Sequence, residues 1–136
     1  MKQLEPLPEE VSLGDILNEL FACNRRHIHQ REEYRFLDCM YVPLTYVYDA
    51  FEFCGIISIT SPVSGCGKTT NLDWFAKYCN NPCLSGNITA SSLFRIADAE
   101  KPTMLIDEFD SINDEMRREI SNLLNNGYQK GRGIMR

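Results

Sequence analysis

The sequence predicts an α/β fold: a parallel sheet with crossover helices, preceded by two N-terminal helices. Three observations carry this prediction. A continuous β-prone run, "FCGIISIT", fills residues 53–60, and two further short apolar runs follow it. Each run is followed by a helical pattern, and the order β-α-β-α-β-α is typical of parallel strands joined by helices. The 136 residues are 43% hydrophobic and 24% charged, which suits one globular domain.

Residues 1–50 are expected to form a helical segment ahead of the core at 51–136. Ser12 and Asp15 make an S-x-x-D capping box before an apolar stripe, so a helix runs to about Asn24. A second helix is expected from 32 to 51, with a proline that either starts its last segment or kinks it. Its aromatic residues allow two interpretations, a stacking surface for bases or packing on a neighbouring sheet, and packing is preferred.

The remaining elements follow in order along the core. The run at 53–60 predicts a strand buried on both faces. We expect helices over 68–79, from a cap at Thr89 to Pro102, and from Asn113 or Asp114 to Gly127. Two more short strands are expected at "PCLSG" and "TMLID".

Charge and composition limit the function classes. The formal net charge of −5 argues against a chain that coats nucleic acid, although the last twenty residues carry five basic side chains and one acidic one. No apolar run reaches the ~18–20 residues of a membrane span, and the acidic, proline-containing N-terminus is unlike a signal peptide. We therefore expect a cytoplasmic protein without membrane contact, whose six cysteines are reduced.

A metal site is the alternative interpretation for part of the cysteine set. The chain has no C-x-x-C pair, and the nearest ligand group is Cys23, His27, His29 and Cys39. Structural zinc sites usually close with two tightly spaced ligand pairs, and Cys39 stands alone on an apolar helix face. Buried or unused thiols are the preferred interpretation.

A phosphate-binding loop is predicted between the first strand and its helix. The pattern G-x-x-x-x-G-K-[ST] is matched by Gly67, Lys68 and Thr69, while Pro62 replaces its first glycine. Backbone N–H groups must face the phosphate oxygens, which requires unusual φ values at Gly65 and Gly67. Lys68 would bridge the outer phosphates and the Thr69 hydroxyl would join the Mg²⁺ shell. The nucleotide-binding residues are predicted to be Val63, Ser64, Gly65, Cys66, Gly67, Lys68, Thr69 and Thr70.

A second acidic motif, "KPTMLIDEFD", supplies the partner of this loop. Asp107 and Glu108 follow a short strand at its carboxyl end, where ligands of α/β sheets bind. Asp107 would hold Mg²⁺ and Glu108 would polarise the attacking water. Adjacent carboxylates at a strand end repel each other unless a cation lies between them. The Asp-Glu pair favours ATP hydrolysis, to ADP and phosphate, over phosphoryl transfer to a second substrate.

Four stretches together resemble a known family. "ITSPVSGCGKTTNLDWF", "LSGNITASSLFRI", "KPTMLIDEFD" and "LLNNGYQKG" are similar to a P-loop ATPase domain family of unknown function from phages, prophages and plasmids, helicase-like and associated with primases. The resemblance covers roughly residues 45–136, and Pro62 fits it. It implies a three-layer α/β/α P-loop NTPase core of the additional-strand class, with Mg-ATP as ligand. It also implies a role in replication or mobilisation of a mobile element, with DNA, replication proteins and further copies of the chain as candidate partners.

Domains of this family continue into a strand with a polar sensor residue and a region with an arginine finger. The chain stops at "GRGIMR", so we expect an N-terminal fragment with an incomplete sheet. Two alternatives to an ATPase stay open: a module that holds nucleotide without turnover, and a nucleotide-independent adaptor that uses its aromatic helices.

Overall fold

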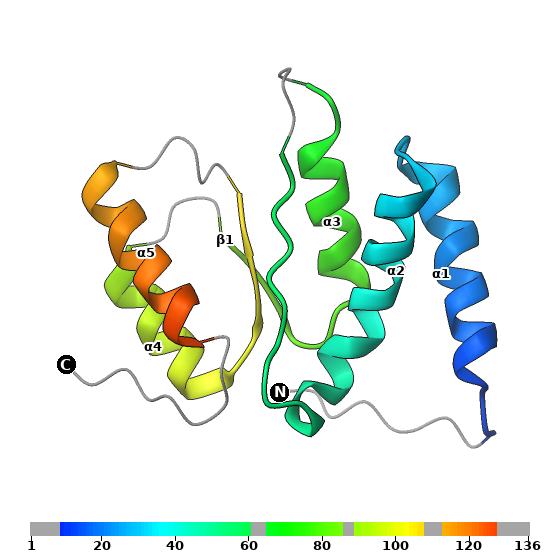
Figure 1. Ribbon diagram of the computed structural model, residues 1–136, viewed down its shortest axis with the longest axis horizontal. Helices are drawn as coiled ribbons and strands as arrows, with labels where there is room; N and C mark the ends of the chain where they lie inside the picture. The colour runs from blue at the N-terminus through cyan, green and yellow to red at the C-terminus, as the bar shows by residue number, and fades with distance from the viewer. Residues whose placement is uncertain (1–8, 61–64, 86–88, 108–112, 128–136) are drawn as a thin grey trace.

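The computed structural model describes residues 9–60, 65–85, 89–107 and 113–127 (Figure 1). Its elements alternate between helices and short strands after an N-terminal helical pair. In chain order they are α1 (Leu13–His27), α2 (Glu32–Val47), the 3₁₀ turn η1 (Tyr48–Ala50), α3 (Lys68–Tyr78), β1 (Pro82–Ser85), α4 (Ala90–Glu100), β2 (Thr103–Ile106) and α5 (Asp114–Gly127).

Local capping fixes the starts of three helices, as the sequence predicted. The Ser12 hydroxyl accepts from the backbone N–H of Asp15 at 3.1 Å and donates to the Asp15 carboxylate at 2.7 Å. Thr89 and Asn113 cap α4 and α5 in the same way, each accepting from the N–H three residues on. Such caps satisfy donors that the first helical turn leaves unpaired. The predicted helices are present, but two of their ends differ: α1 runs three residues beyond its expected end, and α2 ends at Val47, four residues before its expected end, where the 3₁₀ turn η1 begins.

The sheet of the described residues consists of two parallel strands. β1 pairs with β2 in a register that sets Pro82 opposite Thr103 and Ser85 opposite Ile106. Helix α4 is the crossover between them, as parallel pairing requires. In Figure 1, α3 lies on one side of this strand pair while α4 and α5 lie on the other. The α/β class is confirmed at this level, and the full three-layer P-loop NTPase sheet stays a prediction.

The segment 53–60 differs from its prediction. Only Phe53 forms an isolated bridge, and residues 54–60 have no regular secondary structure. Burial on both faces is also wrong, because Phe53 and Ile56 are 53% and 55% exposed. Ile57 and Ile59 do pack against the core. β1 and β2 pair with each other, and among the described residues the backbone of 56–60 makes no hydrogen bond that would add it to their ladder.

One apolar cluster joins the N-terminal helices to the core. It combines side chains of α1 and α2 with α3 and β2, and its buried members are Leu20, Ile28, Cys39, Val42, Trp74, Phe75, Cys79 and Leu105. Polar contacts add to it: the Tyr46 hydroxyl donates to the Tyr78 carbonyl at 3.1 Å, and the Thr45 hydroxyl accepts from the Asn80 N–H at 2.9 Å. Helix α2 is thereby held against α3, which begins at the loop predicted to bind phosphate.

Candidate nucleotide-binding site

The end of the predicted phosphate loop has the backbone conformation that its glycines predict. Gly65 and Gly67 have φ values of +78° and +88°, in the left-handed region that only glycine enters at little cost. Gly67 is the N-cap of α3, and its carbonyl accepts from the Asn71 N–H at 3.0 Å. The helix then begins at Lys68, so its N-terminal N–H groups and dipole lie beside the lysine. This arrangement favours an anion at the helix start.

Asp107 of the second acidic motif lies beside the first turn of α3. The Asp107 backbone N–H donates to the Ser85 carbonyl at 3.0 Å, which extends the β1–β2 ladder by one bond and fixes the end of β2. The Thr69 hydroxyl donates to an Asp107 carboxylate oxygen at 3.4 Å. Two groups separated by 38 residues are therefore adjacent, and they are the pair that the sequence predicted to share a metal.

The chemistry of this pair suits Mg²⁺. The ion takes oxygen ligands at about 2.0–2.1 Å in octahedral geometry, so neighbouring ligands lie about 3 Å apart. The Thr69 and Asp107 oxygens at 3.4 Å need a shift of only a few tenths of an ångström to bind one ion. Within the described residues no group of three or more His, Cys, Asp or Glu side chains is placed to hold a metal. Phosphate oxygens and water would therefore complete the shell, as is usual for Mg²⁺.

The other predicted site residues divide into two groups. Cys66 and Thr70 are exposed at the loop and on the first turn of α3, and Lys68 is half-buried. Pro62, Val63, Ser64 and the proposed catalytic Glu108 lie outside the described residues. The structure therefore brings Lys68, Thr69 and Asp107 to one region and leaves the position of Glu108 untested.

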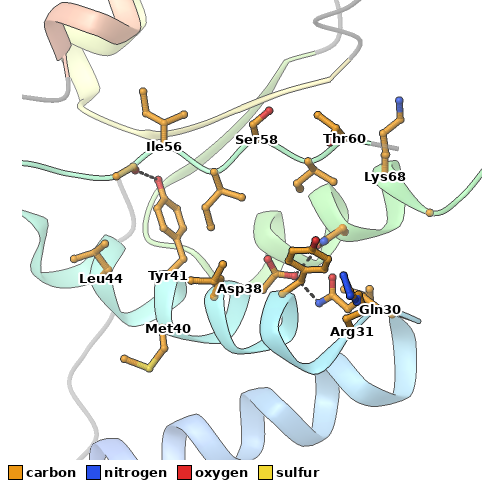
Figure 2. Close-up of a pocket in the computed structure, with 18 of the residues that line it drawn as sticks. Gln30, Arg31, Asp38, Met40, Tyr41, Leu44, Ile56, Ser58, Thr60 and Lys68 are labelled. Atoms are coloured by element: carbon orange, nitrogen blue, oxygen red, sulfur yellow. Dashed lines mark hydrogen bonds between the residues drawn. The ribbon is translucent and has the colours of Figure 1, made fainter. Parts of the chain in front are cut away.

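A groove opens from this region towards the N-terminal helices. It has a volume of about 1120 Å³ and lies between α2 and residues 55–60, with Gly67 and Lys68 at one end. Figure 2 shows Lys68 and Thr60 at the same end as Gln30, Arg31 and Asp38, while Leu44 and Ile56 lie at the other end. The groove is thus polar beside the phosphate loop and apolar away from it.

A buried hydrogen-bond network forms the polar end. One Asp38 carboxylate oxygen accepts from the Gln30 amide at 2.7 Å and from the Asn71 amide at 3.1 Å. Behind it, Arg35 donates to the Asn24 side chain at 2.7 Å. Sequence reasoning missed this network. A signal was available, because Arg35, Asp38 and Thr45 share the helical spacing of the buried α2 residues Cys39 and Val42.

The alternative zinc group is not assembled. No three of Cys23, His27, His29 and Cys39 gather as ligands in the described chain. Cys39 is fully buried, and burial raises the pKa of its thiol to about 11. The Cys23 sulfur instead contacts the Tyr78 hydroxyl at 3.0 Å. All six cysteines lie in the described residues, and none of them forms a disulfide bond.

Comparisons with known proteins do not add an identity. No protein-family model, curated protein or solved structure matches this chain. The resemblance to the phage and plasmid ATPase family therefore stays an interpretation of the four motifs. None of the described helices combines the length and the apolar composition that a membrane span needs.

Proposed function

We propose that this chain binds Mg-ATP at the start of α3 and belongs to an ATPase. The observation that carries the proposal is the contact between Thr69 and Asp107 at 3.4 Å. Phosphate and magnesium binding require a particular combination of groups. The combination is a loop whose glycines have positive φ values, a lysine at a helix N-terminus, and a carboxylate beside the hydroxyl that follows the lysine. A structural explanation is weaker, because a hydrogen bond between exposed side chains adds little stability.

The proposed chemistry assigns each residue a task. Lys68 and the α3 N–H groups hold the outer phosphates, and Thr69 and Asp107 hold the ion. Glu108, one residue beyond Asp107, orients and deprotonates the attacking water. The four motifs further support a role in DNA replication or mobilisation of a mobile element in the cytoplasm, with DNA or replication proteins as partners.

A double-mutant cycle tests the metal pair. ATP affinity would be measured with and without Mg²⁺ for the parent, Thr69→Val, Asp107→Asn and the double variant. We expect each single change to reduce the Mg²⁺-dependent gain in affinity, and the two effects to couple by about 0.5 kcal/mol or more. A shared ion would be contradicted if the effects of the two substitutions on ATP affinity were strictly additive. It would also be contradicted if ATP affinity were the same with and without Mg²⁺.

Turnover has a separate test. Glu108→Gln should keep ATP affinity within about threefold and lower single-turnover hydrolysis by at least about a hundredfold, as expected for loss of a general base. Equal hydrolysis by parent and variant would remove Glu108 from the mechanism. A parent that binds Mg-ATP without hydrolysing it would support a binding module in place of an ATPase.

A further inference from the structure

The groove is larger than a phosphate site requires. Its volume of about 1120 Å³ slightly exceeds the usual range of about 300–1,000 Å³ for small-molecule pockets. Gly67, Lys68 and residues 28–31 of the connection between α1 and α2 all line it, and Figure 2 shows Lys68 at the same end as Gln30 and Arg31. A ligand anchored by phosphates at Lys68 would therefore have its remaining part beside this connection.

Hydrogen-bond acceptors characterise the near end of the groove. Asp38 lines it with only 4% of its surface exposed, and its carboxylate already orders the Gln30 and Asn71 amides. Asn71 lines it too and is 5% exposed, and its Oδ1 atom has no hydrogen-bond partner among the described residues. A buried acceptor without a partner is costly. A ligand that presents N–H donors here would supply the partner.

An aromatic surface accompanies these acceptors. Tyr34 lines the groove and is about half exposed. The Arg31 guanidinium carbon lies 5.8 Å from the centre of its ring. Tyrosine rings and arginine planes are common stacking partners for nucleic-acid bases. The base-stacking interpretation of the α2 aromatics, set aside on the sequence alone, has support at this one position.

We propose that this end of the groove binds the base of the nucleotide and selects a base with an exocyclic amino group. The inference rests on the proposed nucleotide function. The carboxylate of Asp38 and Oδ1 of Asn71 are acceptors, which complement the amino group of adenine or guanine. Hypoxanthine lacks that group, and uracil presents carbonyl oxygens that face the acceptors unfavourably. Tyr34 stacks on the base, while Lys68 holds the phosphates.

Ligands that differ by one amino group test this selection. Dissociation constants in Mg²⁺ would be measured for ATP, GTP, ITP and inorganic tripolyphosphate. We expect ATP or GTP to bind at least tenfold more tightly than ITP, since hydrogen bonds to charged groups are worth about a factor of ten or more. In Asp38→Asn this ratio should fall below about threefold. A purely structural role of Asp38 would weaken ATP and ITP equally and leave the ratio unchanged, which would overturn the proposal.

A second variant keeps the test informative if Asp38→Asn does not fold. Tyr34→Ala should weaken ATP relative to tripolyphosphate by about five- to tenfold through lost stacking. Phe36→Ala is the matched control, because Phe36 is an equally exposed aromatic of α2 outside the groove. Equal binding of ATP, ITP and tripolyphosphate, all dependent on Lys68, would overturn base selection and leave the phosphate site intact. Absence of Lys68-dependent tripolyphosphate binding would instead remove the proposed function.

Discussion

The left-handed conformation of Gly67 gives a prediction whose size follows from the structure. Gly67 has φ +88° and ψ +17°. A Cβ atom placed on it would meet nothing within 4 Å, so Gly67→Ala introduces no clash. Its cost is the backbone penalty of an L-residue in the left-handed region, about 1–2 kcal/mol. Part of this is offset because alanine also restricts the unfolded chain.

Gly55→Ala is the matched control. Gly55 also has open space around its Cβ position, and its φ lies outside the left-handed region. Both variants restrict the unfolded chain equally, so their difference isolates the penalty of about 1–2 kcal/mol. In urea unfolding this corresponds to midpoints about 0.5–1 M apart for an m-value near 2 kcal/mol/M. Equal midpoints would show that Gly67 does not hold this conformation in solution.

Two further predictions concern the thiols. Burial raises the pKa of Cys39 and of Cys79 from 9.0 to about 11. The stability that these neutral thiols contribute is therefore complete below pH 9 and is lost as the pH rises through 11. Urea midpoints should fall over that interval, and they should fall less in Cys39→Ala. Cys66 is exposed in the predicted phosphate loop, and it should be alkylated at pH 8 at least about tenfold more slowly when Mg-ATP is present at a hundred times its Kd. The half-buried Cys83 of β1 is the internal control. Equal slowing of both thiols would indicate that the ligand stabilises the whole protein in place of covering the loop.

The features that could be predicted from the sequence are those whose causes lie within a few residues. Ser12 meets its partner three residues away, and Thr89 and Asn113 do the same. The positive φ of Gly65 and Gly67 follows from loop chemistry alone. The closeness of Asp107 to Thr69 could also be expected, because ligand groups gather at the carboxyl ends of parallel strands.

The failures concern partners distant in the sequence. Residues 53–60 have the composition of a strand, but composition does not supply the hydrogen-bond partners that a ladder needs. The network of Asp38 with Asn71 joins residues 33 positions apart, and it depends on how α2 packs on α3. The groove arises from the same packing, so local pattern could not predict its volume or its acceptors. Sequence pattern therefore predicted the glycine conformations and the contact between Thr69 and Asp107, and it missed the groove.

The central claim is that the start of α3 binds the phosphates of Mg-ATP, and Lys68 tests it most directly. Calorimetry would compare Lys68→Ala with Lys77→Ala, which removes the same charge from the exposed far end of the same helix. We predict that Lys68→Ala lowers Mg-ATP affinity at least tenfold, about 1.4 kcal/mol or more, while Lys77→Ala changes it less than twofold. Equal affinities for the two variants would contradict the assignment of the phosphate site.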